Sequence, residues 1–291
     1  MLTAEDHEIR RGRMTGSTAA AALGLDPYCT PLGAWLRIMG RDTDADEGTR
    51  ARWRRGHVLE PALMRFAAEE IANDTGATVA IDTPPTIVHS SIPWAACSID
   101  AMFVARPGPR TVVELDALTV PEAAKVSTYG GEGKTVDQRH AWAWGEPWTD
   151  QIPAHVAVQC TWEILHYPDV EAIVIPVLIG AGLDLRCYVW QRDAALEAAC
   201  VDTLDAWHRR HVVANEPPPL GPKDADVLST VWRASGRVHP DDPRVAALVK
   251  VDCAARATIA AAEKERDAVR VALASILQDA TECGGKWGGV T

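Results

Sequence analysis

The hydrophobic period changes in the middle of the chain, and this change most constrains the fold. Apolar residues recur at helical spacing up to about residue 73. Between about 77 and 120, the stretches ATVAIDTPPTIVHS, AACSIDAMFVA and TVVELDALTV are instead rich in β-branched and apolar residues and are bounded by prolines. These stretches predict an antiparallel meander that follows a helical segment.

The second half of the chain returns to helices and adds two strands. Pro153 begins a predicted helix, EAIVIPVLIG and LRCYVWQRD predict strands, and an amphipathic helix follows. This order predicts the α+β (mixed α/β) class, with a central, mostly antiparallel sheet flanked by helices. A proline-rich break, NEPPPLGPKD, divides the chain into a domain of 1–215, a linker of 216–242 and a C-terminal helical extension of 243–291.

Composition excludes several classes of protein. Hydrophobic content of 47% and charged content of 24% are those of an ordinary folded chain. No apolar run is long enough to span a membrane and the N-terminus has no apolar signal core, so we expect a cytoplasmic protein without a membrane partner. Seven cysteines without a CxxC pair argue against a zinc ribbon or an iron–sulfur cluster. The net charge of -11 argues, at first sight, against nucleic acid.

Three carboxylates near one predicted turn indicate a metal site. Asp100 lies in an otherwise apolar strand, where a lone carboxylate needs a partner, a metal ion or solvent. Glu114 and Asp116 follow with period two and therefore share one face of the next strand. A regular hairpin around Pro107 and Gly108 would bring the three side by side, where a divalent cation would offset their repulsion. The alternative is that these carboxylates simply face solvent.

Four separated motifs, in one order, resemble the YqaJ-like and lambda-type phage alkaline exonuclease (viral recombinase) family of the PD-(D/E)xK nuclease superfamily. They are MTGSTAAAALGLDPYCTPLGAW, RGHVLEPALMRFAAEE, IPWAACSIDAMF and WGEPWTDQIPAHVAVQCTWEILHY. The resemblance covers roughly residues 10–215. It implies a restriction-endonuclease-like PD-(D/E)xK core that hydrolyses phosphodiester bonds at DNA duplex ends with Mg²⁺, or with Mn²⁺ in its place.

The resemblance also assigns residues. By position it implies that Glu60 supports the metal site and that Asp100 binds metal. Glu114 matches the acid of the family's E-x-K pair, Gln159 matches a functional glutamine, and Ser17 matches a serine that binds a DNA phosphate. The metal would then be held by Asp100, Glu114 and the carbonyl of Leu115.

The chain departs from the family at the lysine of the E-x-K pair, because Asp116 lies two residues after Glu114. One alternative takes Glu122 and Lys125 as the pair, and downstream spacing favours it. A hybrid keeps Asp100 and Glu114 as metal ligands and lets Lys125 reach the site from the next segment. A third interpretation is that catalysis is lost, leaving a DNA-binding or recombination accessory protein on the nuclease fold.

Clustered arginines qualify the argument from net charge. Arg50, Arg54 and Arg55 precede Glu60 in a predicted helix, and Arg13 precedes the Gly-Ser motif. Positive charge beside a metal site suits a DNA track, because phosphates must be neutralised along the strand. The resemblance further implies phage or prophage origin in a bacterial host, a single-strand annealing protein as partner, and a homo-oligomeric ring.

Overall fold

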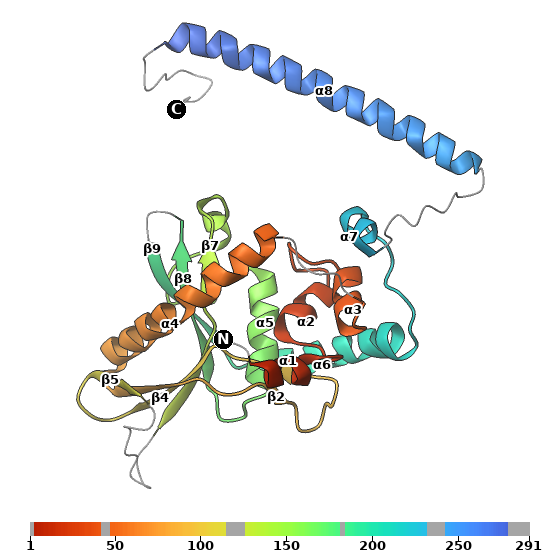
Figure 1. Ribbon diagram of the computed structural model, residues 1–291. Helices are drawn as coiled ribbons and strands as arrows, with labels where there is room; N and C mark the ends of the chain where they lie inside the picture. Colours follow the sequence, from red (N-terminus) through yellow and green to blue (C-terminus); the bar gives the residue numbers. More distant parts are fainter. Residues whose placement is uncertain (1–2, 42–46, 115–125, 181–183, 232–241, 279–291) are drawn as a thin grey trace. The chain divides into compact units, whose positions relative to one another are not determined.

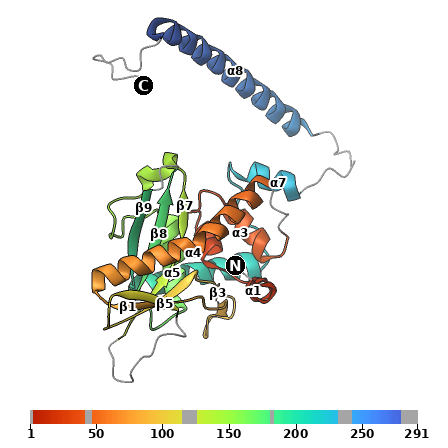
Figure 2. The ribbon, with the colours of Figure 1, turned by 60° about the vertical axis from the view of Figure 1, so that its left-hand side comes forward.

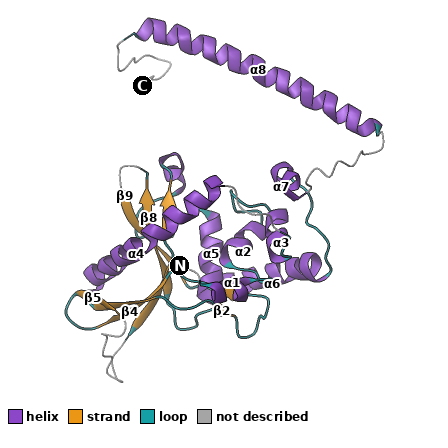
Figure 3. Ribbon diagram, viewed as in Figure 1, coloured by secondary structure: helices purple, strands orange, loops and turns teal. Residues whose placement is uncertain are grey.

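The computed structural model describes residues 3–41, 47–114, 126–180, 184–231 and 242–278. By internal contacts the chain divides into two compact units, Met1–Arg233 and Ala234–Thr291. The first unit is an α+β structure, with a sheet flanked by helices as predicted (Figure 3). None of the described helices has both the length and the apolar character needed to cross a membrane.

Seven helices and nine strands make up the described part of the first unit, together with a 3₁₀ segment, η2, and a π segment. The helices are α1 (Ala4–Arg10), α2 (Gly16–Ala22), α3 (Pro31–Ile38), α4 (Glu47–Thr75), α5 (Ala154–Leu165), α6 (Ala194–His208) and α7 (Asp224–Val231). The strands are β1 (Thr78–Asp82), β2 (Ile87–Val88), β3 (Ala96–Cys97), β4 (Ala101–Arg106), β5 (Thr111–Glu114), β6 (Ser127–Gly131), β7 (Lys134–Val136), β8 (Ala172–Ile179) and β9 (Asp184–Gln191). The segment η2 spans Gln138–Ala143 and the π segment spans Arg209–Val213.

The main sheet is mixed rather than mostly antiparallel. Its order is β5-β1-β4-β6-β8-β7, with β9 also paired to β8, and β2 pairs only with β3 in a separate ribbon. Among the described strands of the main sheet, three pairings are antiparallel (β1–β4, β4–β6, β8–β9) and three are parallel (β1–β5, β6–β8, β7–β8). The meander predicted for 77–120 is therefore wrong in one respect, because β5 joins β1 in parallel instead of β4.

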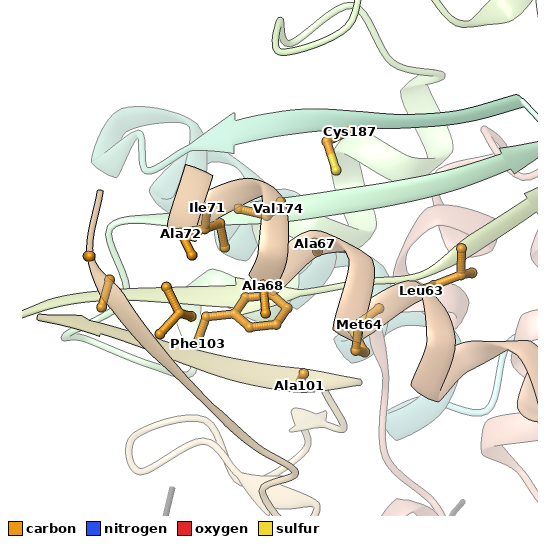
Figure 4. Close-up of a cluster of buried hydrophobic side chains, with 13 residues drawn as sticks. Leu63, Met64, Ala67, Ala68, Ile71, Ala72, Ala101, Phe103, Val174 and Cys187 are labelled. Atoms are coloured by element: carbon orange, nitrogen blue, oxygen red, sulfur yellow. The ribbon is translucent and has the colours of Figure 1, made fainter. Parts of the chain in front are cut away.

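Helices cover both faces of this sheet. On one face α4 packs through Leu63, Met64, Ala67 and Ile71 against Phe103 and its neighbours (Figures 1 and 4). On the other face α5 packs through its buried residues against β8 and Tyr188 of β9. Figure 2 gives a second view of α4 lying across the sheet. Because β8 is covered on both faces, its sequence AIVIPVLI is almost continuously apolar rather than alternating.

A third layer of helices supports α5. Helices α2, α3 and α6 share a core with α5 that includes Met14, Trp162 and Leu204. Helix α7 lies in the stretch expected to be a linker, 216–242, yet Val227 and Leu228 pack against the core of α3. The second unit contains α8 (Pro243–Leu277), which falls in the predicted extension of 243–291.

Candidate active site

The centre of the site is a break between two strands that share one register. Gly131 at the end of β6 pairs with Val174, and Lys134 at the start of β7 pairs with Val177. Both strands therefore pair with β8 in one register, like two parts of a single interrupted strand. Pro176 lies on β8 opposite this interruption, and a proline has no N–H to give to a ladder. The backbone N–H of Glu132 still donates to the carbonyl of Val174 at 3.2 Å, so the ladder is interrupted only after Glu132 and resumes at Lys134.

Asp100 contacts this break directly. It immediately precedes β4, and its backbone N–H donates to the carbonyl of Gly131 at 3.1 Å. Its Oδ2 accepts the backbone N–H of Gly133 at 2.9 Å, a donor that the interrupted ladder leaves available. A Cβ at position 133 would lie 3.0 Å from Met64 Cε and 3.6 Å from Asp100 Oδ2, so glycine lets α4 and Asp100 approach the break closely.

Glu132, Lys134 and Gln159 form a hydrogen-bonded network beside Asp100. Lys134 Nζ donates to Glu132 Oε1 at 2.6 Å and to Gln159 Oε1 at 2.9 Å. Gln159 Nε2 donates to Glu132 Oε1 at 2.7 Å and, one turn along α5, to Glu163 Oε1 at 2.8 Å. Glu132 and Glu163 are buried and Lys134 is largely buried. The network thus gathers two acids, an amide and an ammonium where β6 and β7 meet α5.

Burial and crowding shift the ionisation of these groups. Burial raises the pKa of Asp100 well above its usual range, the charges of Glu132 and Glu60 raise it further, and the Gly133 N–H and Lys134 oppose them. For Lys134, burial alone would lower the pKa, but the charge and hydrogen bond of Glu132 raise it above its ordinary value. Without a bound metal ion, Lys134 is therefore an ammonium at neutral pH and donates to both of its partners.

Two further residues face the network from other helices. Glu60 lies on α4, one turn before Met64. The Oε2 atom of Glu60 lies 3.3 Å from His57 Nδ1. Arg10 at the end of α1 donates from Nη1 to Ser98 Oγ at 3.1 Å. Burial lowers the pKa of Arg10, while the charges of Cys97, Glu132 and Glu163 oppose that shift, which places its guanidinium in the field of the same acids.

The acids fit a hard divalent cation. Within the described ranges, no group of three or more His, Cys, Asp or Glu side chains is arranged to hold a metal ion unaided. Mg²⁺ requires less, because it keeps several waters and binds through one or two carboxylates together with substrate phosphates. Asp100 and Glu132 supply two carboxylates beside the break. Burying like charges together is unfavourable, as the raised pKa of Asp100 indicates. A cation between the two carboxylates would offset that repulsion.

The predicted hairpin between Asp100 and Glu114 is wrong. The turn at Pro107 and Gly108 passes over the start of β1, where Thr78 Oγ1 donates to the carbonyl of Pro109 at 2.7 Å. The chain thereby crosses β1, so that β4 pairs with one edge of β1 and β5 with the other. Glu114 ends β5 on the outer edge of the sheet, exposed, and β1 separates it from β4.

The other residues of that prediction lie outside the described part of the chain. These are Leu115, Asp116, Glu122 and Lys125. Their roles as a metal ligand, an alternative acid pair and a distant lysine stay predictions from the sequence.

Residues expected to bind DNA occupy three kinds of position. Ser17 is exposed on α2, next to Gly16, whose Cβ would meet Gln159 and Glu163. Arg50, Arg54 and Arg55 are exposed on the first half of α4, the helix that carries Glu60. Arg13 instead donates to the carbonyls of Ile9 and Pro93, at 2.6 and 3.0 Å, and so ties the chain after α1 to the segment before β3.

Sequence reasoning missed three residues of the site: Glu132, Lys134 and Glu163. A signal for two of them was present, because Glu132-Gly133-Lys134 has the E-x-K spacing without any departure. Its glycines resemble a loop, whereas Gly130 and Gly131 belong to the buried end of β6. Glu163 carries no local signal, since only the packing of α5 brings it to the other acids, whereas Arg10 belongs to the basic stretch with Arg11 and Arg13 before the Gly-Ser motif.

The first unit is thus an α+β protein with a carboxylate and lysine centre at an interrupted strand. Residues 7–166, more than half of the chain, match the YqaJ-like viral recombinase domain. The chain belongs to that family, which confirms the family inferred from the four motifs.

Solved structures give a weaker similarity. The chain is similar to an alkaline exonuclease (LHK-Exo) from Laribacter hongkongensis, with 14% sequence identity and a TM-score of 0.45, over 70% of this chain and 90% of that one. It is also similar to LHK-Exo in complex with dAMP, with 15% identity and a TM-score of 0.46, over the same shares of the two chains. The chain matches no curated protein.

Proposed function

We propose that the protein is a metal-dependent DNA exonuclease of phage-type recombination, which hydrolyses phosphodiester bonds at duplex ends. The observation that carries the proposal is the network at the strand break, where Asp100, Glu132 and Lys134 meet Gln159. Membership of the YqaJ-like viral recombinase family supports the same conclusion. The exposed single strand would then be available for annealing.

Asp100, Glu132 and the backbone carbonyl of Gly133 are the ligands that we propose for Mg²⁺, with Mn²⁺ as a substitute. Glu132 and Gly133 thereby take the roles that the resemblance gave to Glu114 and Leu115. When bound, such an ion supplies positive charge for the scissile phosphate and a more acidic water. Glu60 on α4 faces Asp100 through its charge and would orient a ligand or a water on that side.

Lys134 contributes a fixed positive charge. Its Nζ has three protons, of which Glu132 and Gln159 accept two, so one remains to orient the attacking water or to donate to a phosphate oxygen. Glu132 holds the pKa of Lys134 above its ordinary value, so the side chain presents an ammonium to the site. Lys134 would therefore stabilise developing charge, as preorganised donors do.

Positive side chains around the acids would hold the DNA. Arg10 is held near Glu132 and Glu163 through Ser98, and a phosphate could take its remaining N–H donors. Ser17, beside Gly16, is the proposed phosphate contact on α2. Arg50, Arg54 and Arg55 would neutralise phosphates farther along the duplex. A net charge of -11 is compatible with this arrangement, because the arginines are concentrated where the strand would run.

The alternative, a catalytically impaired accessory protein, was motivated by Asp116 in the lysine position. The intact pair Glu132-x-Lys134 removes that motive. The single-strand annealing protein and the homo-oligomeric ring stay predictions from the family resemblance.

The proposal is tested by digestion of linear duplex DNA with the purified full chain. We expect nucleotides to be released with Mg²⁺ and no release with EDTA. Asp100→Asn should abolish release while a gel shift of the duplex persists, because the phosphate contacts proposed above come from other residues. Matched circular duplex, which has no ends, should stay intact. Retained binding without degradation of the linear duplex by the unaltered protein would contradict the exonuclease and favour the accessory function.

A further inference from the structure

Glu163 is a buried acid that the proposed chemistry does not use. It lies on α5, one turn after Gln159, with an exposed fraction of 2%. Its Oε1 accepts from Gln159 Nε2, and its Oε2 has no hydrogen-bond partner among the described residues. Burial raises the pKa of Glu163 well above its usual range, and the charge of Glu132 raises it further. A half-satisfied buried acid destabilises a fold, so stability does not account for it.

The geometry around Gln159 indicates what Glu163 does. The Gln159 amide has two N–H donors and one carbonyl oxygen. The donors go to Glu132 and Glu163, and the oxygen accepts from Lys134. Rotating the amide by half a turn would set its N–H groups against the ammonium of Lys134 and its oxygen against two acids. Each acid on the nitrogen side therefore favours the orientation that presents the oxygen to Lys134.

Helix α2 closes the space around this pair. A Cβ on Gly16 would lie 2.8 Å from Gln159 Cγ and 3.2 Å from Glu163 Oε1. The backbone of α2 therefore already touches both side chains and leaves little room for other rotamers.

We propose that Glu163 is a positioning residue for the nuclease reaction, which holds the Gln159 amide in the orientation that fixes Lys134 beside Glu132. The proposal rests on the proposed function, since Lys134 matters only if this site hydrolyses DNA.

Two substitutions separate positioning from a structural role. Glu163→Leu removes the acceptor but fills the space, so we expect an unchanged or higher thermal midpoint together with a 10- to 100-fold lower kcat at unchanged KM for DNA. Glu163→Gln keeps an acceptor oxygen and should retain kcat within about threefold. The proposal is overturned if Glu163→Leu keeps the full kcat, or if both variants lose activity equally.

A crystal structure of Glu163→Leu gives a readout that does not depend on activity. We expect Gln159 to turn and the Lys134 Nζ to Gln159 Oε1 contact of 2.9 Å to be lost. An unchanged contact would overturn the role of Glu163 whatever the assay shows. If instead the unaltered protein fails to release nucleotides with Mg²⁺, the proposed function fails, so the two failures are distinguishable.

Helix α8 supports a second, independent inference. It runs from Pro243 to Leu277, and no residue of it is buried. Leu248 is 69% exposed, Ile259 58% and Ile276 76%. Alanine-rich sequence keeps such a helix formed, but large apolar side chains repeated along its length indicate an interaction surface.

These apolar residues form a seam with spacings of three and four, the heptad pattern of a coiled coil. The seam consists of Val245, Leu248, Asp252, Ala255, Ile259, Ala262, Arg266, Val269, Leu273 and Ile276. Only Asp252 and Arg266 interrupt its apolar character, so they decide which pairing of two such helices is favourable.

Charge selects an antiparallel arrangement. In a parallel pair, Asp252 would face Asp252 and Arg266 would face Arg266, and like charges in a seam repel. An antiparallel pair centred near Ala260 and Ala261 brings Asp252 within about one turn of Arg266 of the second copy, twice. It also places Arg256 near Glu263 on the flank. The exposed ion pair of Arg256 with Asp252 inside one helix, at 2.8 Å, contributes little and can be exchanged.

We infer that α8 is a self-association surface, which pairs antiparallel with α8 of a second copy of this chain. Sedimentation of the full chain across a concentration series tests the inference. We expect a concentration-dependent dimer that Arg266→Asp weakens at least 10-fold and that Asp252→Arg combined with Arg266→Asp restores.

The control is Lys264→Asp, which changes the same charge away from the seam and should leave the dimer intact. A chain that stays monomeric at all concentrations overturns the inference. So does a dimer that is indifferent to Arg266→Asp, since it would form elsewhere, or a double variant that fails to recover.

Discussion

Two strands of the sheet each lead into a glutamate, and only one of these glutamates lies in a chemical centre. Glu114 ends β5 at the outer edge of the sheet, where it is exposed. Glu132 follows β6 in the interior of the sheet, where it is buried and accepts from Lys134 and Gln159. Both residues follow aliphatic or small residues in a β-rich segment, so local sequence does not separate them.

The difference between them is the neighbourhood that the fold supplies. An exposed carboxylate on an edge strand is solvated at little cost, and it helps to keep the edge from pairing with another chain. A buried carboxylate requires partners from several elements, and Glu132 has them from β7 and α5. The cost of burying an acid is thus itself a marker of function, because a fold retains such a group only with a dedicated network.

The largest expected contrast is between Glu132→Gln and Glu114→Gln. Each substitution removes one carboxylate and keeps the shape of the side chain. We expect Glu132→Gln to lower the rate of nucleotide release on the order of 10³-fold or more, because a proposed metal ligand is lost. Glu114→Gln should stay close to the unaltered rate. Equal losses in a digestion assay would show that the edge strand belongs to the site after all.

The next contrast concerns the two candidate lysines. Lys134→Met removes the ammonium held by Glu132 and Gln159, and we expect a loss of kcat of about 10²- to 10³-fold, as for other preorganised donors. Lys125→Met tests the lysine that downstream spacing favoured, and it should retain activity. Single-turnover rates at saturating enzyme are the measurement. Full activity in Lys134→Met together with loss in Lys125→Met would reverse the assignment.

Substitutions in the interior strand β6 and in the edge strand β5 should also differ in their effect on the free energy of unfolding. A Cβ at Gly131 would lie 2.7 Å from Phe103 Cε2 and 2.8 Å from Met64 Sδ, so Gly131→Ala forces the core between β6 and α4 apart. We expect a loss of about 1–3 kcal/mol in the free energy of unfolding, measured with urea. The exposed Thr111→Ala on β5 should change it by less than about 0.5 kcal/mol. Similar values for both would argue against the tight packing at β6.

The smallest expected effect is the change in DNA affinity on replacing single arginines. Arg54 on α4 is exposed on the helix that leads to Glu60, while Arg110 is exposed beside β5. We expect Arg54→Ala to weaken duplex binding a few-fold and to reduce the slope of log affinity against log salt by about 0.7–0.9, the value of one phosphate contact. Arg110→Ala should leave the slope unchanged. A salt titration by fluorescence anisotropy measures both, and equal slopes for the two variants would remove α4 from the DNA track.

Local pattern was enough to predict many of the helices and strands, but not β7 or α7, and the family resemblance supplied three members of the candidate site. The period of α4, the Pro153 start of α5 and the apolar run of β8 are read directly from the chain, because each depends on neighbouring residues. Glu60, Asp100 and Gln159 were assigned by resemblance. In the structure Gln159 donates to Glu132, and the charges of Glu132 and Glu60 both act on Asp100.

The partner of Asp100 could not be predicted, because strand pairing is not a local property. Consecutive strands usually pair, and that tendency favoured the hairpin with Glu114. Here β4 pairs with β1 on one edge and with β6 on the other, so β5 pairs instead with the outer edge of β1. The parallel pairings of β6 and β7 with β8 join residues more than 40 positions apart along the chain, and only this long-range contact turns a glycine-rich stretch into the centre of the site.

At the interruption between β6 and β7, the contacts that form the sheet are distinct from the side chains that belong to the candidate site. Because β6 and β7 keep one register along β8, the sheet is specified on both sides of the break by backbone contacts that do not depend on the side chain of Glu132. The ladder would therefore form in the same way with another side chain at position 132. Glu132→Gln keeps an acceptor for Lys134 and Gln159, so it should keep the fold and bind a DNA end without degrading it, which makes it a means of trapping the protein on DNA.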